Sequence, residues 1–186
     1  TLPNLITLAR LVVMTPVLGY LIVHHYHVAA FVTLAATALT DWIDGWMARR
    51  YHCQTVVGSV LDPLADKVLM TVLTATLMSA GLVPLPLGAL ILARDASLML
   101  AAAVMRYRHL PPPRSLKAYV DLAGHPATEI RPPFSSKLNT ALQLVLMTSS
   151  LAAPVWNAAW LASAPMLGLQ AAVAATTLVS WVEYLV

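Results

Sequence analysis

Long apolar stretches alternate with short polar segments along this chain. Six stretches approach the roughly 20 residues that a helix needs to cross the hydrocarbon core of a bilayer. They lie at about residues 5–23, 28–47, 58–80, 87–105, 135–153 and 160–181. The pattern predicts an all-α integral membrane protein with six transmembrane helices, which form one catalytic domain over residues 1–186.

The segments between the predicted spans are mostly short. The exception is the polar loop 106–134, in which prolines at 111–113 and 132–133 interrupt helices. Pro3 and Asn4 favour a helix entry, which predicts an interfacial helix at the amino-terminal end. The sequence shows neither a soluble domain nor an internal repeat.

Composition agrees with a membrane protein and narrows its partners. Hydrophobic residues make up 59% of the chain and charged residues 10%, and the mean hydropathy is +0.75. A net charge of +3 is too small to argue for a nucleic-acid partner. The single cysteine, Cys53, excludes an internal disulfide and a cysteine-rich metal site. The sequence starts with Thr1 rather than methionine, which is compatible with a leader that was removed or left out, so targeting is not read directly from this end.

The basic residues orient the predicted spans. Six spans put both chain ends on one side of the membrane, and almost all Lys and Arg residues fall at the loops and span ends of that side: Arg10, Arg49, Arg50, Lys67, Arg106, Arg108, Arg114, Lys117, Arg131 and Lys137. The opposite loops, near residues 24–27, 81–86 and 154–159, contain neither Lys nor Arg. This asymmetry follows the positive-inside rule and agrees with an even number of spans.

Half of the chain's eight acidic residues lie in one strongly apolar window: Asp41, Asp44, Asp62 and Asp66. Charged groups at membrane depth are costly and need a partner or a role. Helical spacing puts Asp41 and Asp44 on one face of the second span, and Asp62 and Asp66 on one face of the third. If these two helices are antiparallel and in contact, they pool four carboxylates in one cleft at the basic side of the membrane.

Four carboxylates in one cleft require cations. Two divalent cations would neutralise them, and an all-oxygen ligand set suits Mg²⁺ or Mn²⁺. Gly45 and Gly58 lie on the same helix faces and leave room for a ligand, while Arg49, one turn from Gly45, suits a phosphate. This arrangement predicts metal-assisted phosphoryl transfer, in which a carboxylate not fully used by the metals accepts a hydroxyl proton.

The same window resembles the signature of the CDP-alcohol phosphatidyltransferase family at every fixed position: Asp41, Asp44, Gly45, Ala48, Arg49, Gly58, Asp62 and Asp66. The resemblance implies the fold of that family and a homodimer. It implies that the four aspartates hold two divalent ions and that Asp66 is also the general base on the acceptor hydroxyl. The residues it assigns to CDP-lipid binding are Gly45, Ala48, Arg49, Gly58 and Thr7.

Segments outside the signature resemble the eukaryotic, mitochondrial branch of the family that forms cardiolipin. They are residues 3–10, 58–67, 94–95, 106–114 and 136–140. This resemblance implies transfer of a phosphatidyl group from CDP-diacylglycerol to phosphatidylglycerol at the mitochondrial inner membrane, with the active site on the matrix side. A different acceptor, such as glycerol-3-phosphate or inositol, stays open, because members that use glycerol-3-phosphate share residues 3–10 and 62–67.

Basic and hydroxyl side chains are the candidates for acceptor-lipid binding: Arg94, Arg106, Arg114, Lys137 and Thr140. Arg94 lies inside a predicted span and needs either a carboxylate such as Asp95 or a phosphate. Lys137 and Thr140 lie one turn apart at a helix start, where a phosphate is favoured, although a snorkelling lysine and a helix cap explain them equally. The basic run from Arg106 to Arg131 fits anionic headgroups or a positive-inside signal alone. Lys67 follows Asp66 directly and so points about 100° away from it.

Two alternatives remain. The turn with His24, His25 and His27 invites a metal site, but a loop at the membrane interface explains it with fewer assumptions. Buried carboxylates also occur in cation-coupled transporters and lipid-binding scaffolds, which would release no CMP. A carrier, however, has no need of this spacing of glycine and arginine.

Overall fold

The computed structural model describes residues 7–50, 58–109 and 134–185, where all regular structure is helical. Residues 44–45, 47–50, 58–63, 109 and 185 are described only as parts of their helices, without their side chains. The elements are a π-helical turn η1 (Arg10–Met14), α2 (Thr15–Val23), α3 (His27–Arg50), α4 (Gly58–Ser79), α5 (Leu85–His109), α7 (Phe134–Trp156), a 3₁₀ turn η2 (Ala158–Ala162) and α8 (Ala164–Leu185). The expected amino-terminal interfacial helix and most of the polar loop lie outside the described residues.

The described helices have the apolar character of a membrane protein. Three of them are long and apolar enough to cross a membrane, at Leu85–Arg108, Phe134–Trp156 and Ala164–Tyr184. Two shorter apolar helical stretches run over Thr7–Val23 and His27–Ile43. Many large apolar side chains are exposed on these helices, as expected where lipid tails rather than water surround them. The chain is therefore an integral membrane protein whose described part is all-helical.

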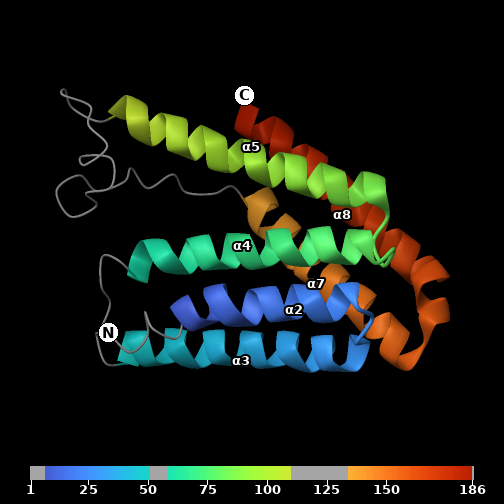
Figure 1. Ribbon diagram of the computed structural model, residues 1–186. Helices are drawn as coiled ribbons and strands as arrows, with labels where there is room; N and C mark the ends of the chain where they lie inside the picture. Colours follow the sequence, from blue (N-terminus) through green and yellow to red (C-terminus); the bar gives the residue numbers. More distant parts are fainter. Residues whose placement is uncertain (1–6, 51–57, 110–133, 186) are drawn as a thin grey trace.

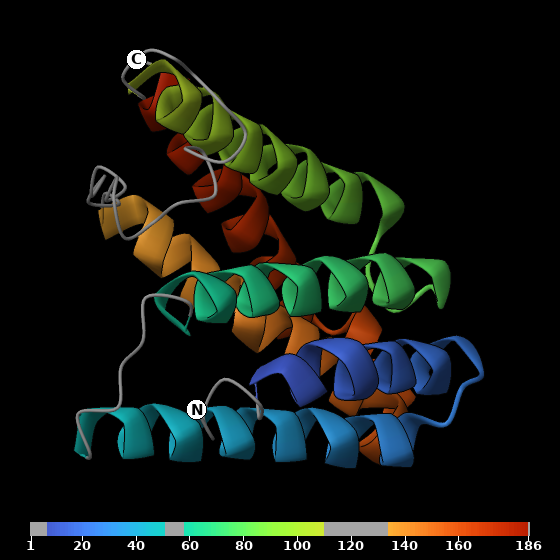
Figure 2. The same cartoon turned by 60° about the vertical axis from the view of Figure 1, so that its left-hand side comes forward.

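The helix α2 lies between α3 and α4 in both views of the bundle (Figure 1, Figure 2) and packs against each of them. Gly19 permits this on the α4 side, because a Cβ atom there would lie 3.2 Å from Val72 Cγ1 and 3.4 Å from Thr76 Cγ2. Small residues of this kind let helix backbones approach closely in a membrane. The two motif helices thus each pack on α2, whereas direct contact between their motif ends falls partly outside the described residues and stays a prediction.

The buried core joins the central parts of the helices. Its fully buried members include Leu18 and Ile22 of α2, Leu73 and Leu77 of α4, and Leu146 of α7. Within a bilayer these contacts stabilise the bundle mainly through close packing, because lipid tails are as apolar as leucine. The bundle therefore depends on shape complementarity and on interhelical hydrogen bonds.

The turn between α4 and α5 sets the angle between these helices. Gly81 adopts a left-handed conformation with φ of 72°, which glycine accepts without strain. A Cβ atom on Gly88 would lie 2.7 Å from Met78 Sδ, so the helices are close just after the turn. Farther from the turn α5 leans away from α4 (Figure 1, Figure 2). The two helices thus diverge toward the end of the bundle where α4 begins and the acidic motif continues.

Candidate functional site

The acidic motif is divided between two helix ends that lie at the same end of the bundle (Figure 1). The last part of α3 contains Asp41, Asp44, Gly45, Ala48 and Arg49, and the first part of α4 contains Gly58, Asp62 and Asp66. Only the side chains of Asp41 and Asp66 belong to the described residues, and both residues are exposed. The predicted pooling of all four carboxylates thus falls partly outside the described side chains.

Asp41 has a partner that the sequence did not suggest. The buried guanidinium of Arg10 in η1 forms an ion pair with Asp41 Oδ1, so the amino-terminal segment reaches the acidic motif. Thr7, which is also buried, lies one helical turn before Arg10. The sequence indicated Arg10 as a basic residue that orients the spans and as part of the segment 3–10, not as a partner of Asp41. A signal was nevertheless present, because an arginine within an apolar helix requires an acidic or phosphate partner.

The donor set of the motif fits a pair of divalent cations chemically, since Mg²⁺ and Mn²⁺ prefer carboxylate oxygens. Among the described side chains there is no group of three or more potential metal ligands, and the side chains of Asp44 and Asp62 are not part of that set. Because only one carboxylate oxygen of Asp41 pairs with Arg10, its other oxygen is compatible with a metal ligand.

The histidine turn forms no metal site among the described side chains. His25 adopts a left-handed conformation with φ of 59°, and the rings of His25 and His27 have centroids 5.6 Å apart. Burial lowers the pKa of His27, and the neighbouring His25 lowers it further. These features agree with a turn between α2 and α3 at the end of the bundle opposite the acidic motif.

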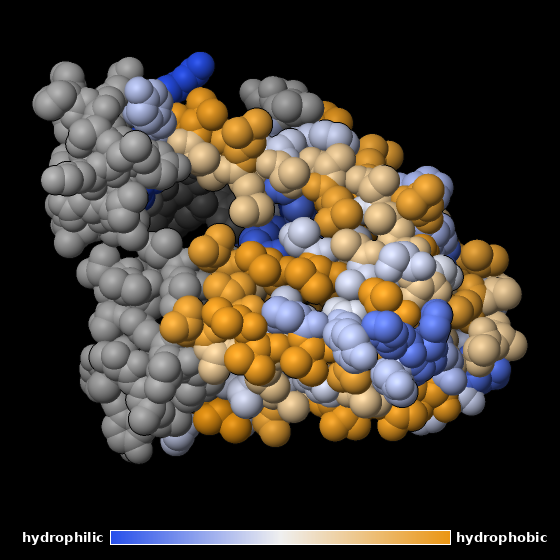
Figure 3. All heavy atoms as spheres, in the orientation of Figure 1, coloured by the Kyte–Doolittle hydropathy of each residue, from blue (hydrophilic) through white to orange (hydrophobic). Residues whose placement is uncertain are grey.

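A cavity of about 410 Å³ opens where α5 leans away from α4. The residues that line it come from α4, α5, α7 and α8: Lys67, Arg94, Leu98, Met99, Ala101, Ala102, Met105, Ser136, Thr140 and Tyr184. In the space-filling view, hydrophilic side chains are visible in a hollow between α5 and α4, with hydrophobic side chains around it (Figure 3). The cavity thus combines a polar floor with an apolar wall.

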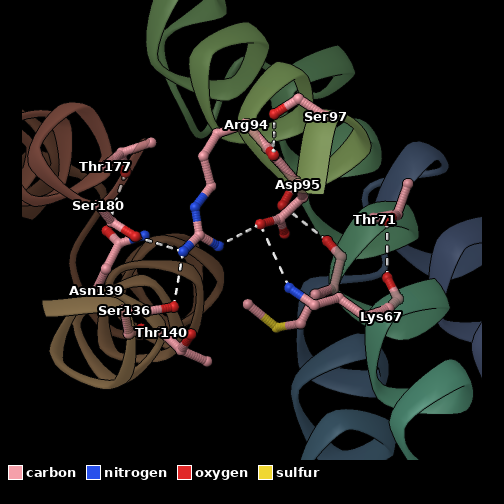
Figure 4. Close-up of polar contacts among 12 residues, drawn as sticks. Lys67, Thr71, Arg94, Asp95, Ser97, Ser136, Asn139, Thr140, Thr177 and Ser180 are labelled. Carbon is pink, nitrogen blue, oxygen red and sulfur yellow. Dashed lines mark hydrogen bonds and ion pairs between the residues drawn. The ribbon is translucent and has the colours of Figure 1, made fainter. Parts of the chain in front are cut away.

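Arg94 joins three helices at this floor. Its guanidinium donates to Asp95 Oδ1 at 2.7 Å, to Ser136 Oγ at 2.8 Å and to Ser180 Oγ at 2.6 Å (Figure 4). The residue is 1% exposed, so these contacts replace water almost completely. Both terminal guanidinium nitrogens are engaged, whereas the buried Nε has no hydrogen-bond partner among the described residues, and a buried arginine is tolerated when its charge is paired. Arg94 therefore fixes α5 against α7 and α8.

Lys67 extends this network to α4. Its Nζ atom lies 3.3 Å from Asp95 Oδ1, the same oxygen that accepts from Arg94 (Figure 4). The Lys67 side chain is 37% exposed, whereas that of Asp95 is 7% exposed. Lys67 follows Asp66 in the chain, so the cavity begins one residue from the last aspartate of the motif. Lys67, which the helical spacing turns about 100° away from Asp66, is the accessible cation of the described cavity lining.

A second polar cluster holds α7 against α8 near the cavity. Asn139 is fully buried, and its Oδ1 accepts hydrogen bonds from Thr176 Oγ1 and Thr177 Oγ1, both at 2.9 Å. Ser135 also donates to Glu183 on α8. Interhelical hydrogen bonds of this kind each contribute about 0.6 kcal/mol in membranes, and they keep Ser136 and Thr140 in place.

Only some of the residues expected to bind the acceptor lie together in the described lining of the cavity. Arg94 and Thr140 line the cavity, and Arg94 also meets the alternative expectation of an ion pair with Asp95. Lys137 is exposed and does not belong to the described lining. Arg106 is half-buried and follows Met105 of the lining, while Arg114 lies outside the described residues.

Comparison with known proteins agrees with this chemistry. The model of the family described as CDP-alcohol phosphatidyltransferase matches residues 1–182. The chain is similar to proteins named cardiolipin synthase (CMP-forming), with 45% identity to that of Rattus norvegicus and 44% to that of Homo sapiens, in each case over 158 residues that make up 84% of this chain and 52% of the relative. It is also 36% identical over 154 residues to CDP-diacylglycerol--glycerol-3-phosphate 3-phosphatidyltransferase 1, chloroplastic, of Oryza sativa subsp. japonica, which covers 82% of this chain and 46% of the relative. The chain spans about half the length of these curated relatives.

Proposed function

Since the chain belongs to the CDP-alcohol phosphatidyltransferase family, we propose that it acts as a cardiolipin synthase. It transfers the phosphatidyl group of CDP-diacylglycerol to phosphatidylglycerol and forms cardiolipin and CMP. The observation that carries this choice of acceptor is the identity of 44% and 45% with relatives named cardiolipin synthase (CMP-forming), over 84% of the chain. The cavity beside Asp66, with its cationic floor and apolar wall, supports a lipid acceptor that bears a phosphate.

The four aspartates of the motif hold the metal in this proposal. Asp41, Asp44, Asp62 and Asp66 bind two divalent cations, Mg²⁺ or Mn²⁺. When bound, these ions neutralise phosphate charge and polarise the phosphoryl group that is transferred. The ion pair with Arg10 would orient Asp41, as outer partners of metal-binding carboxylates do.

The CDP-lipid binds along the motif itself. Gly45 and Gly58 leave space for the nucleotide, Arg49 pairs with its phosphate, and Ala48 and Thr7 complete the pocket. The buried position of Thr7 in the segment that pairs with Asp41 supports its part in this set. Binding at these helix ends keeps the nucleotide at the membrane surface while the acyl chains stay in the bilayer.

Asp66 supplies the base for the transfer. Its carboxylate accepts the proton of the terminal glycerol hydroxyl of phosphatidylglycerol. The hydroxyl oxygen then forms a bond to the β-phosphorus of CDP-diacylglycerol, the bond from that phosphorus to the bridging oxygen breaks, and CMP leaves with the electron pair. The exposed position of Asp66, next to the cavity residue Lys67, supports this role.

The acceptor lipid occupies the cavity between α4, α5, α7 and α8. Arg94 and Thr140 contribute to its floor, and the assignment also includes Arg106, Arg114 and Lys137 at the ends of the polar loop. Met99 and Met105 are both lining residues and strongly exposed. The cavity is therefore open at an apolar edge, which allows a lipid to enter from the bilayer.

The membrane arrangement completes the proposal. Six helices cross the membrane after an amino-terminal interfacial helix, and the protein forms a homodimer in the mitochondrial inner membrane with its active site on the matrix side. The described basic residues Arg10, Lys67, Arg106, Arg108 and Lys137 occur on η1, α4, α5 and α7 at the end of the bundle with the acidic motif. This distribution supports a matrix-facing site.

A direct assay tests the assignment. The purified protein in lipid nanodiscs is given CDP-diacylglycerol, Mg²⁺ or Mn²⁺ and one acceptor at a time, and the products are identified by mass spectrometry. We expect cardiolipin and CMP with phosphatidylglycerol. The absence of CMP release with any acceptor would favour a transporter or scaffold.

A second candidate acceptor is glycerol-3-phosphate. The rice relative, 36% identical and named for that acceptor, is the observation in its favour. In the same assay this candidate predicts phosphatidylglycerophosphate as product and no cardiolipin, so one set of spectra separates the two assignments.

A further inference from the structure

We propose that the π-helical turn η1 sets the helical phase that directs Arg10 toward Asp41, and that Arg10 thereby raises the affinity of the acidic motif for divalent cations. The inference rests on the proposed function, because it takes Asp41 as one of the metal ligands of that reaction. It makes Arg10 a positioning residue, which acts on the metal through Asp41. It also gives a role to the one turn before α2 that departs from α-helical geometry.

The buried positions of the helical stretch Thr7–Val23 recur at intervals of three or four residues, with one exception. Arg10 follows the buried Thr7 by three residues, and such intervals resume after Thr15. Between Arg10 and Thr15, however, the interval is five. Five residues of a regular α-helix leave the second side chain about 140° from the first. Arg10 and Thr15 would then lie on different faces of the helix, yet both are buried.

The π-helical turn removes this mismatch. It closes with a backbone hydrogen bond from the Thr15 N–H to the carbonyl of Arg10, and the Thr15 hydroxyl donates to the same carbonyl at 3.1 Å. A π-helical turn amounts to one extra residue within an α-helix. Residues five apart therefore share a face across this turn, as residues four apart do in a regular helix. Arg10 thus lies on the same buried face as Thr15.

Pro16 is a local reason for the wide turn. It stands in the first turn of α2, has no N–H to donate, and in a regular α-helix its ring would clash with the carbonyl of Val12, four residues earlier. A π-helical bulge is one way in which a helix accommodates such a conflict. Val12 and Val13 within the turn are exposed, so the extra residue bulges outward without disturbing the core.

The result is an ion pair between two helices. The turn η1 packs against α3 and α4, and the guanidinium of Arg10, only 3% exposed, pairs with Asp41 Oδ1 on α3. The Asp41 side chain is 53% exposed and so stays accessible to an ion. Loss of an outer partner that orients a metal ligand lowers metal affinity by about 10–100-fold. Loss of a mere neighbouring positive charge would instead raise it, so the sign of the change separates the two effects.

Equilibrium binding of Mn²⁺ to the purified full chain tests the role of Arg10 without turnover, because free Mn²⁺ is counted by its electron paramagnetic resonance signal. We expect Arg10→Met to weaken Mn²⁺ binding by about tenfold. Arg10→Lys should lose less, because an ammonium can still pair with Asp41. Arg108→Met is the charge control: it removes an exposed cation at the same end of the bundle and should leave the affinity unchanged. Unaltered or tighter Mn²⁺ binding in Arg10→Met overturns the proposal.

An insertion tests the helical phase. An alanine placed between Val12 and Val13 puts Arg10 six residues before Thr15, which turns it off the buried face. We expect this variant to lose Mn²⁺ affinity as Arg10→Met does. Exchange of the next two residues in the same variant, Arg10→Leu with Leu11→Arg, returns an arginine to the interval of five and should restore the affinity. Failure of this exchange to restore Mn²⁺ binding contradicts the assigned phase.

A deletion should have the opposite outcome to the insertion. Removal of Val13 together with Pro16→Ala takes away the extra residue and its local cause, and it leaves Arg10 four residues before Thr15. A regular α-helix places residues four apart on one face, so we expect wild-type Mn²⁺ affinity and a melting temperature above that of the insertion variant. A deletion variant that does not fold, or that loses Mn²⁺ affinity as the insertion variant does, overturns the role of the π-helical turn.

Failure of this inference and failure of the proposed function are distinguishable, because Mn²⁺ binding is measured without substrate. A protein that shows the expected order of Mn²⁺ affinities but releases no CMP refutes the proposed function and leaves the role of Arg10 standing. A protein that forms cardiolipin, with the same Mn²⁺ affinity in Arg10→Met and wild type, refutes the role of Arg10 alone.

Discussion

Arg94 on α5 donates a hydrogen bond of 2.6 Å to Ser180 on α8, which lies 86 residues farther along the chain. The same guanidinium nitrogen also reaches Ser136 on α7 at 2.8 Å. Three helices that the polar loop separates in sequence are thus held at one point inside the bundle. The alternatives that the sequence leaves for Arg94, an ion pair or a place in a phosphate site, are compatible, because the paired arginine forms part of the cavity floor.

Replacement of Arg94 should lower the stability of the folded protein. Arg94→Met leaves Asp95 buried without its closest partner, and breaking a buried ion pair costs about 3–5 kcal/mol. We expect a marked fall in the melting temperature of the purified protein, measured by fluorescence in detergent. Ser97→Ala is the control, since Ser97 only donates to the carbonyl of Arg94 within α5. Equal melting temperatures for Arg94→Met and wild type would contradict this structural role.

Close packing of α2 on α4 should be sensitive to a larger residue at position 19. Gly19→Val places branched carbons where a single Cβ already lies 3.2 Å from Val72, and overpacking of this kind costs about 1–3 kcal/mol. Gly168→Val is the matched control, because a Cβ at Gly168 meets no atom within 4 Å. We expect Gly19→Val alone to lower the melting temperature, and similar values for the two variants would argue against close α2–α4 packing.

Sequence periodicity predicted the helical class, but it did not predict which helices are neighbours. An apolar helix face in a membrane can contact either lipid or another helix. The hydropathy of α2, α3 and α4 therefore does not show that α2 lies between the motif helices. The family signature identified the acidic motif because its chemistry depends on residue type and local spacing. The neighbours of Lys67 could not be predicted from the local spacing that places Asp66, because Lys67 lies on a different face of α4. Residues about 100° apart on a helix meet different neighbours, and α5 and α7 supply those of Lys67.

Asp66→Asn should abolish turnover while binding of the CDP-lipid largely survives. The amide keeps the shape of the side chain but cannot accept the acceptor's proton, and it is a poorer ligand for a divalent cation. CMP release and equilibrium binding of CDP-diacylglycerol are measured on the same preparation. Normal CMP release would remove Asp66 as the base, and loss of CDP-lipid binding in a folded variant would make metal binding its main role.

Arg49→Ala should weaken binding of the nucleotide lipid more than binding of the acceptor. A charge-assisted hydrogen bond to phosphate contributes about 1.5–3 kcal/mol, so we expect the KM for CDP-diacylglycerol to rise about tenfold or more. The KM for phosphatidylglycerol should change little. Arg50→Ala is the control, because Arg50 adjoins Arg49 on α3 but lies outside the family signature. An unchanged KM for CDP-diacylglycerol in Arg49→Ala would refute the assignment.

Substitutions of two lysines near the cavity should differ in their effect on the KM for the acceptor lipid. Lys67 lines the cavity and contacts Asp95, whereas Lys137 is exposed at the start of α7 and lies outside the described lining. We expect Lys67→Ala to raise the KM for phosphatidylglycerol several-fold more than Lys137→Ala, with the KM for CDP-diacylglycerol nearly constant in both. A larger effect of Lys137→Ala would move the phosphate contact to the start of α7, whereas unaltered kinetics would make Lys137 a lysine that snorkels to the interface. Because both substitutions remove one positive charge at the same end of the bundle, the difference between them reports position rather than net charge.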